Sequence, residues 1–264
     1  MPRSEPFTDI HGHFLPGIDD GADDWGMSLA MARMAVDEGF RTVVATPHQL
    51  GGYAVNSGDI IRRLTVEYQQ RLDAENVALQ VLPGADVRIE DGMIGRLRRG
   101  DVLTLGDQGR HVLLELPHEI FMPLEGLLEQ LTKIGIVGIL SHPERNQGIL
   151  RQSNVLKPLV NAGCLMQVTA GSIDGAFGER IRRFTEWMLQ SGLVHLIATD
   201  AHGVETRQPT IRQAFERTCQ LTDDQTGIDL CCRHPAAVAA GEDVSPGRRQ
   251  VKRRRLSTWL RRAG

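Results

Sequence analysis

Histidines and carboxylates recur in short polar motifs along most of the chain, and most of these motifs come at or just after a stretch of aliphatic residues. Imidazole and carboxylate groups together suit Mn, Fe, Zn or Co. One catalytic zinc ion takes about three protein ligands, whereas about eight or nine donors indicate two or three ions with bridging carboxylates. Such a cluster lowers the pKa of bound water and clamps the attacking and leaving oxygens of a phosphoester. The motifs are HGH at 11–13, DD at 19–20, TPH at 46–48, GAD at 84–86, Glu115, SHPER at 141–145 and TDAH at 199–202.

Two arginines lie close to the last two motifs. Arg145 follows His142 by three residues. Arg207 follows His202 by five residues. A guanidinium group binds phosphoryl oxygens through two parallel hydrogen bonds, so these arginines predict an anionic substrate. No cysteine stands at a strand end before a phosphate-binding loop, which argues against a phosphatase with a cysteine nucleophile.

Buried parallel strands must position these side chains. Seven aliphatic segments show little polar alternation, as expected for parallel strands covered on both faces. They lie at 7–13, 42–47, 78–84, 111–116, 136–140, 164–169 and 194–199. Segments of helical periodicity separate them, and helix-ending glycines fall at Gly39, Gly135, Gly163 and Gly192. Repeated βα units predict an α/β barrel, whose carboxyl-terminal rim would gather these distant motifs in one site.

The composition predicts a cytoplasmic protein with one large domain. The 264 residues, 41% hydrophobic and 24% charged, fit a barrel of ~250 residues. The longest apolar stretch, 134–140, is far shorter than the ~20 residues that span a bilayer. Residues 1–8 lack the apolar core of an export signal. The four cysteines match neither a disulfide framework nor a zinc motif, which favours a reducing compartment.

A basic tail at 241–264 follows the domain expected at 1–240, across the segment GEDVSPG. Residues 248–264 carry eight Lys or Arg and no acid, which leaves a net charge of −11 for residues 1–247. The tail could form a short helix. A solvated basic end is one interpretation, and contact with the inner membrane surface or with an acidic partner is another. The acidic body argues against nucleic-acid binding.

The ordered motifs resemble those of the bacterial PHP (polymerase and histidinol phosphatase) family of protein-tyrosine phosphatases, which act in capsular and exopolysaccharide biosynthesis. The resemblance spans roughly residues 7–240 and rests on DIHGHFLPGIDDGA, VVATPH, LPGADVRI, LLELP, SHPER, QVTAGS and IATDAH. It implies the PHP fold, a distorted (β/α)7 TIM-like barrel, with two or three divalent ions, most often Mn²⁺ with Fe, Co or Zn as alternatives. It also implies that Arg145 and Arg207 bind the phosphate of phosphotyrosine. The implied metal ligands are His11, His13, Asp20, His48, Asp86, Glu115, His142, Asp200 and His202.

Two positions depart from the family pattern. Asp86 stands where most relatives have Glu, and its side chain is one methylene shorter, so we expect it to bridge two ions less readily. Gln49 stands where many relatives have a further His, and we leave it out of the site. The resemblance alone favours Asp20 over Asp19, which could instead cap a turn. Glu144 could pair with Arg145 or with an exposed lysine, and as a charged loop residue it is expected to be solvated.

These features predict a metal-dependent phosphatase that removes phosphate from tyrosine on a bacterial tyrosine kinase controlling polysaccharide synthesis and export. The ions, Arg145 and Arg207 would stabilise the charge on the phosphoryl group. The proton for the leaving tyrosinate could come through Asp200, His202 or water. The alternatives are a histidinol-phosphate-like phosphomonoesterase, an amidohydrolase and a non-catalytic module anchored by the tail. Glu115 argues against an amidohydrolase, which usually has a bridging lysine in that strand. The phosphotyrosine-bearing kinase is the expected partner, and a homo-oligomer remains open.

Overall fold

The computed structural model describes residues 5–245 and 247. Its named strands all pair in parallel and lie close to the predicted aliphatic segments. The strands are β1 (Phe7–Gly12), β2 (Phe40–Ala45), β3 (His48–Gln49), β4 (Gln80–Pro83), β5 (Asp86–Arg88), β6 (His111–Glu115), β7 (Val137–Ser141), β8 (Leu165–Thr169) and β9 (Leu196–Ala198). The basic residues 248–264 and the helix expected there lie outside the described residues.

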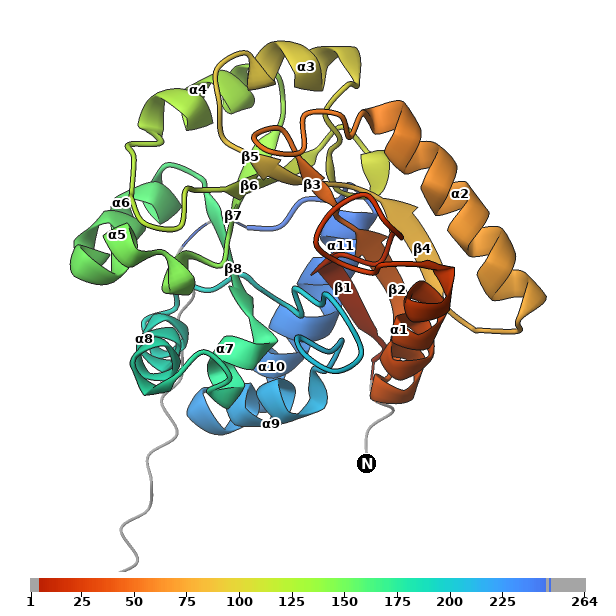
Figure 1. The fold of residues 1–264 in the computed structure, drawn as a ribbon. Coiled ribbons are helices and arrows are strands. Elements are labelled where there is room, and N and C mark those ends of the chain that lie inside the picture. The colour runs from red at the N-terminus through yellow and green to blue at the C-terminus, as the bar shows by residue number, and fades with distance from the viewer. Residues whose placement is uncertain (1–4, 246, 248–264) are drawn as a thin grey trace, which may run out of the picture.

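Helices connect the strands and surround them (Figure 1). The α-helices are α1 (Trp25–Glu38), α2 (Gly58–Ala74), α3 (Met93–Arg99), α4 (Glu125–Lys133), α5 (Gln147–Arg151), α6 (Leu156–Asn161), α7 (Ala170–Asp174), α8 (Glu179–Gln190), α9 (Arg212–Leu221), α10 (Asp224–Ile228) and α11 (His234–Ala239). Short 3₁₀ segments are η1 (Leu105–Asp107), η2 (Pro143–Arg145) and η3 (Ser153–Val155), and η4 (Asp229–Arg233) is π-helical. Gly39 ends α1 with a left-handed φ of 101°, as the sequence predicts. Among the described residues, no helix has the length and apolarity needed to cross a bilayer.

The strands form two sheets that join into a distorted barrel. One sheet has the order β1-β2-β4, and the other has the order β3-β5-β6-β7-β8-β9. The chain runs from β2 into β3 across residues 46–47 and from β4 into β5 across residues 84–85. Beyond β9, Gly12 pairs with Ala201, and the His13 amide donates to the Ala201 carbonyl at 2.8 Å. This arrangement confirms the predicted α/β barrel.

The sequence predicts neither β3 nor β5 as a strand. β3 pairs His48 with Asp86, and β5 pairs Arg88 with Glu115. Both strands are too short, at two and three residues, to show a periodic pattern. Pro47, which has no N–H group to donate, precedes β3 and marks the change from one sheet to the other. This change places His48, Asp86 and Glu115 on three adjacent strands.

The polar end of the barrel rests on an aliphatic interior. Side chains from both sheets form one buried cluster, which also includes residues of α11. The cluster contains Ile10, Val44, Leu113, Ile139, Leu165, Leu196, Ala198 and Val238. Burying an aliphatic side chain of this size contributes about 1.5–3 kcal/mol, so this layer holds the strands that carry the polar rim.

Gly148 in α5 packs directly on the chain at 120–121. An added β-carbon would lie 2.2 Å from the Phe121 amide nitrogen, so the helix or the loop would have to shift. We expect Gly148→Ala to lower the free energy of unfolding, measured in urea, by about 1–3 kcal/mol. Gly126→Ala in α4 is the control, because apart from its chain neighbours and the backbone of its own helix no atom lies within 4 Å of the added β-carbon. Equal stability of the two variants would contradict this packing.

Candidate metal centre

All nine predicted metal ligands lie together at the carboxyl ends of the strands. They form four groups, and within each group one potential ligand atom per residue lies within 4.8 Å of the others. The groups share members and therefore form one continuous cluster. They are His13, Asp20, His48 and His202; His11, His142 and Asp200; His11, His13 and Asp86; and His48, Asp86 and Glu115.

A bulge in β1 explains how consecutive residues serve both the core and the site. Asp9 pairs with Val43 and Gly12 pairs with Ala45, so β1 has one more residue than β2 over this stretch. A bulge of this kind re-aims the side chains that follow it. Ile10 can therefore lie in the aliphatic interior while His11 enters the polar cluster.

The two histidines of β1 and the following loop are oriented by partners that the sequence analysis did not assign. His11 Nδ1 lies 2.9 Å from Gln167 Oε1, and His13 Nδ1 lies 2.6 Å from Asp19 Oδ2. Both oxygens only accept, so each Nδ1 donates and each Nε2 faces the cluster, where it has no hydrogen-bond partner among the described residues. Metal-binding histidines typically have such an outer partner. Gln167, a polar residue in an aliphatic strand, was the available signal.

Asp86 lies between two of the groups. Its carboxylate is fully buried, and neither oxygen has a hydrogen-bond partner among the described residues. Oδ2 lies 3.5 Å from His11 Nε2 and 3.7 Å from His48 Nδ1. The shorter side chain does not keep Asp86 away from either group, because β5 lies directly beside β3. Unpartnered buried oxygens facing imidazoles fit a cation better than they fit an ordinary packed core.

The other edge of the cluster is more open to solvent. Asp20 Oδ1 lies 3.4 Å from His48 Nε2 and 3.5 Å from His202 Nε2, and the Asp20 side chain is 51% exposed. The neighbouring imidazoles of His202 and His48 lower the pKa of Asp20 below its ordinary value. His202 Nδ1 donates to the backbone carbonyl of Asp200 at 2.9 Å, which turns Nε2 toward Asp20. Asp20 thus enters the cluster itself, whereas Asp19 supports His13.

Asp200 connects the cluster to both predicted arginines. Its Oδ1 lies 3.3 Å from His11 Nε2 and 3.5 Å from His13 Nε2. Its Oδ2 pairs with Arg145, and Arg207 Nη2 lies 2.5 Å from the same oxygen. Two guanidinium groups therefore converge on one anionic oxygen at the edge of the cluster, as two phosphate-binding groups would. We call Arg145 and Arg207 the arginine pair.

The SHPER turn that carries Arg145 is anchored from beneath by Glu144. The expectation that Glu144 is solvated is wrong, because its side chain is fully buried. It accepts hydrogen bonds from the Thr169 amide at 2.9 Å and the Ser172 hydroxyl at 2.7 Å. The Arg145 guanidinium carbon lies 4.3 Å from the centre of the Phe177 ring. Thr169 at the end of β8 and Ser172 in α7 thus hold the turn, and Phe177, between α7 and α8, holds the guanidinium group.

Strained backbone conformations mark the same segments. His142, Asp200 and Arg207 have φ angles of 32°, 53° and 48°, in the left-handed region that costs a non-glycine residue about 1–3 kcal/mol. Strain of this kind persists where the surroundings fix it and is concentrated at functional sites. All three residues belong to the cluster or to the arginine pair.

The buried charges of the cluster neutralise one another. Burial alone would raise the pKa of Asp200, but the imidazoles of His11 and His13 outweigh it and hold that pKa well below its ordinary value. Burial opposes protonation of His13, but the neighbouring carboxylates of Asp19 and Asp200 raise its pKa to about 10. Burial and the Arg145 guanidinium group lower the pKa of His142 to about 3. A bound cation would thus compete with protons on some histidines and meet a neutral imidazole on His142.

The fold and this site define a class: an α/β-barrel protein with a cluster of histidines and carboxylates that could hold metal ions, next to two converging arginines. The profile of the family described as "Capsular polysaccharide synthesis, CpsB/CapC" matches residues 7–240. The chain belongs to this family.

Relatives of known name agree with this assignment. The tyrosine-protein phosphatase YwqE of Bacillus subtilis is 38% identical over 208 residues, which cover 78% of this chain and 82% of YwqE. CapC of Staphylococcus aureus is 32% identical over 209 residues, covering 79% of this chain and 82% of CapC. A crystal structure from work on YwqE and on CpsB of Streptococcus pneumoniae, described there as metal-dependent tyrosine phosphatases, has a TM-score of 0.87 and 32% identity, and covers 94% of this chain and 100% of that one.

Metal binding is expected to release protons, because a cation at His13 Nε2 must displace the proton that its neighbouring carboxylates stabilise. Lowering the pH from about 8 to about 6 should therefore weaken Mn²⁺ binding, by about tenfold per pH unit for each proton displaced. Calorimetry in two buffers of different ionisation enthalpy gives the number of protons released on Mn²⁺ binding.

The Asp19→Asn variant should bind Mn²⁺ about 10- to 100-fold more weakly, because Asp19 orients His13. Asp23→Asn, which changes an exposed acid in the same loop, should leave Mn²⁺ affinity unchanged. Binding without proton release would contradict this account.

Proposed function

We propose that this chain is a metal-dependent phosphatase that hydrolyses phosphotyrosine in proteins. The observation that carries the proposal is the convergence of Arg145 and Arg207 on one oxygen beside nine potential metal ligands. Membership of the CpsB/CapC family, and relatives named as tyrosine-protein phosphatases, support the same reaction.

The nine clustered residues would hold two or three divalent ions, with Mn²⁺ the first candidate and Fe, Co or Zn as alternatives. The mixture of imidazole and carboxylate donors suits these ions. The unpartnered Nε2 atoms of His11, His13 and His202 and both oxygens of Asp86 fit them as ligand atoms. When bound, such ions lower the pKa of water and neutralise charge on a phosphoryl group.

The chain's own residues would bind and orient the substrate. Arg145 and Arg207 would hold the phosphoryl oxygens, at the point where they now hold Asp200 Oδ2. Phe177 beneath Arg145 limits the orientations of its guanidinium group. Preorganised charge of this kind stabilises a transition state without further rearrangement.

This reaction needs little help from a proton donor to the leaving group. Tyrosine has a pKa of about 10, so tyrosinate leaves more readily than the alkoxide of serine. His202 donates from Nδ1 to the Asp200 carbonyl, so its neutral ring has no proton on Nε2. This favours His202 as a ligand. The pKa of Asp200 is held well below its ordinary value, so the proton is left to water.

The substrate we propose is a bacterial tyrosine kinase that regulates capsular or exopolysaccharide synthesis, acting in the cytoplasm. The family description supports the link to polysaccharide synthesis. The family match at residues 7–240 also supports a catalytic domain at 1–240. Of the segment expected as a tail, Asp243 pairs with Arg110 and Val244 packs in the aliphatic interior. The basic residues 248–264 would be the part that contacts the kinase or the membrane surface.

Removing either guanidinium group tests this function. With Mn²⁺ present, the protein should hydrolyse a phosphotyrosine peptide, and Arg145→Ala or Arg207→Ala should each lower kcat/KM about 10²- to 10³-fold, the usual loss for one preorganised donor. Arg151→Ala, in the nearby helix α5, serves as the control and should retain wild-type turnover. Wild-type rates in both site variants, or no metal-dependent turnover in the wild type, would refute the proposal.

A further inference from the structure

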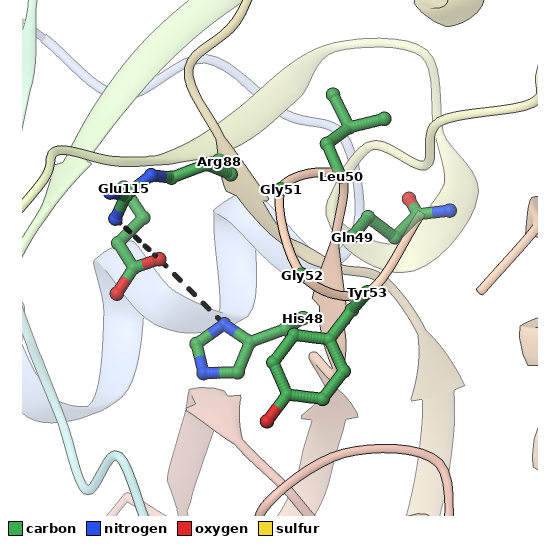
Figure 2. Close-up of a pocket in the computed structure, with 8 residues that line it drawn as sticks. All are labelled: His48, Gln49, Leu50, Gly51, Gly52, Tyr53, Arg88 and Glu115. Carbon is green, nitrogen blue, oxygen red and sulfur yellow. Dashed lines mark ion pairs between the residues drawn. The ribbon is translucent and has the colours of Figure 1, made fainter. Parts of the chain in front are cut away.

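A cavity of about 210 Å³ opens beside the candidate metal centre (Figure 2). His48 and Glu115, two of the clustered residues, form part of its wall. The loop at 49–53 forms another part, and Arg88 at the end of β5 completes it. At ~30 Å³ per water molecule the volume equals about seven waters, enough for a substrate side chain.

Hydrogen bonds from Gln49 to neighbouring segments hold the cavity loop, residues 49–53, in place. The Gln49 side chain points away from Glu115 in Figure 2 and donates to the carbonyls of Asn56, at 2.7 Å, and Asp101, at 3.0 Å. The Tyr53 ring stacks on the His48 ring, with centroids 5.2 Å apart and planes 22° apart. The cavity therefore has a firm aromatic wall directly against a candidate metal ligand.

Arg88 supplies the positive charge of this wall. Its Nη1 donates to the Leu116 carbonyl at 3.2 Å and lies 3.6 Å from Glu115 Oε2. These contacts involve one of the three guanidinium nitrogens, and the side chain is 35% exposed. A guanidinium group has five N–H donors, so donors remain for a second anion.

Two acidic residues in this region, Glu115 and Glu90, have other partners. Glu115 belongs to the cluster with His48 and Asp86, where it would face a cation. Glu90 accepts a hydrogen bond from the Gly51 amide at 3.0 Å. If Glu115 binds a cation, the guanidinium group of Arg88 is available to bind an anionic group in the cavity.

We propose that this cavity is a second subsite, in which Arg88 binds the carboxylate of an acidic residue next to the phosphotyrosine of the substrate. The inference rests on the proposed phosphatase function and narrows its substrate to phosphotyrosine with a neighbouring Asp or Glu. The subsite is separate from the arginine pair, because Arg88 lies at the end of β5 and pairs with Glu115, whereas Arg145 and Arg207 meet at Asp200.

Three phosphotyrosine peptides that differ only in the flanking residues test this subsite: Glu on both sides, Gln on both sides and Lys on both sides. For the wild-type protein with Mn²⁺, kcat/KM for the Glu peptide should exceed that for the Gln peptide roughly three- to tenfold, as expected for a partly exposed charged hydrogen bond. Arg88→Ala should bring this ratio close to one. Arg88→Glu should reverse it and favour the Lys peptide.

Each ratio is measured on one protein preparation, so a change in metal content caused by the substitution cancels. Arg98→Ala, an exposed arginine on α3, is the matched control and should keep the wild-type ratio. Equal wild-type turnover of the Glu and Gln peptides would overturn the subsite alone, as would an unchanged ratio in Arg88→Ala. Failure to hydrolyse any of the three peptides would overturn the phosphatase function, and the subsite with it.

Discussion

Compensation of buried charge is the constraint on which the rest of this structure depends. Asp200 is almost fully buried, with one oxygen facing two imidazoles and the other facing two guanidinium groups. An ionised carboxylate in such a place is costly unless several opposite charges or hydrogen bonds surround it. The irregular features of the barrel, namely the bulge in β1, the change of sheet at β3 and β5 and the left-handed residues on the rim, all bring compensating groups to this region.

Local charge at the site differs from the charge of the chain as a whole. Residues 1–247 carry a net charge of −11, which would repel a phosphorylated protein at long range. At the rim, however, arginines approach the cluster from two directions, and the acids between them face histidines. Since interactions in solvent are screened beyond about 8–10 Å, the groups within the site determine which substrate binds.

Most of this site could be predicted from the sequence, because a barrel places the carboxyl ends of its strands side by side at one rim. The aliphatic segments gave strand positions to within a few residues, which is enough to place the polar motifs at one rim. The family resemblance then selected the nine ligands among them, including Asp20 in place of Asp19. The short strands β3 and β5 could not be predicted, because a pattern of two or three residues has no period. Charged loop residues are usually solvated, which predicts an exposed Glu144. Its burial depends instead on hydrogen bonds with Thr169 and Ser172, which lie 25 and 28 residues away in the sequence. The supporting roles of Asp19 and Gln167 likewise depend on side-chain directions that spacing does not give.

Anomalous diffraction at the manganese edge, from crystals of the wild-type protein grown with Mn²⁺, tests the central claim most directly. The account predicts two or three anomalous peaks inside the cluster, with Asp86 between them and Nε2 of His11 and His13 directed at them. Density for water alone among these side chains, or manganese only at other places on the protein, would contradict it.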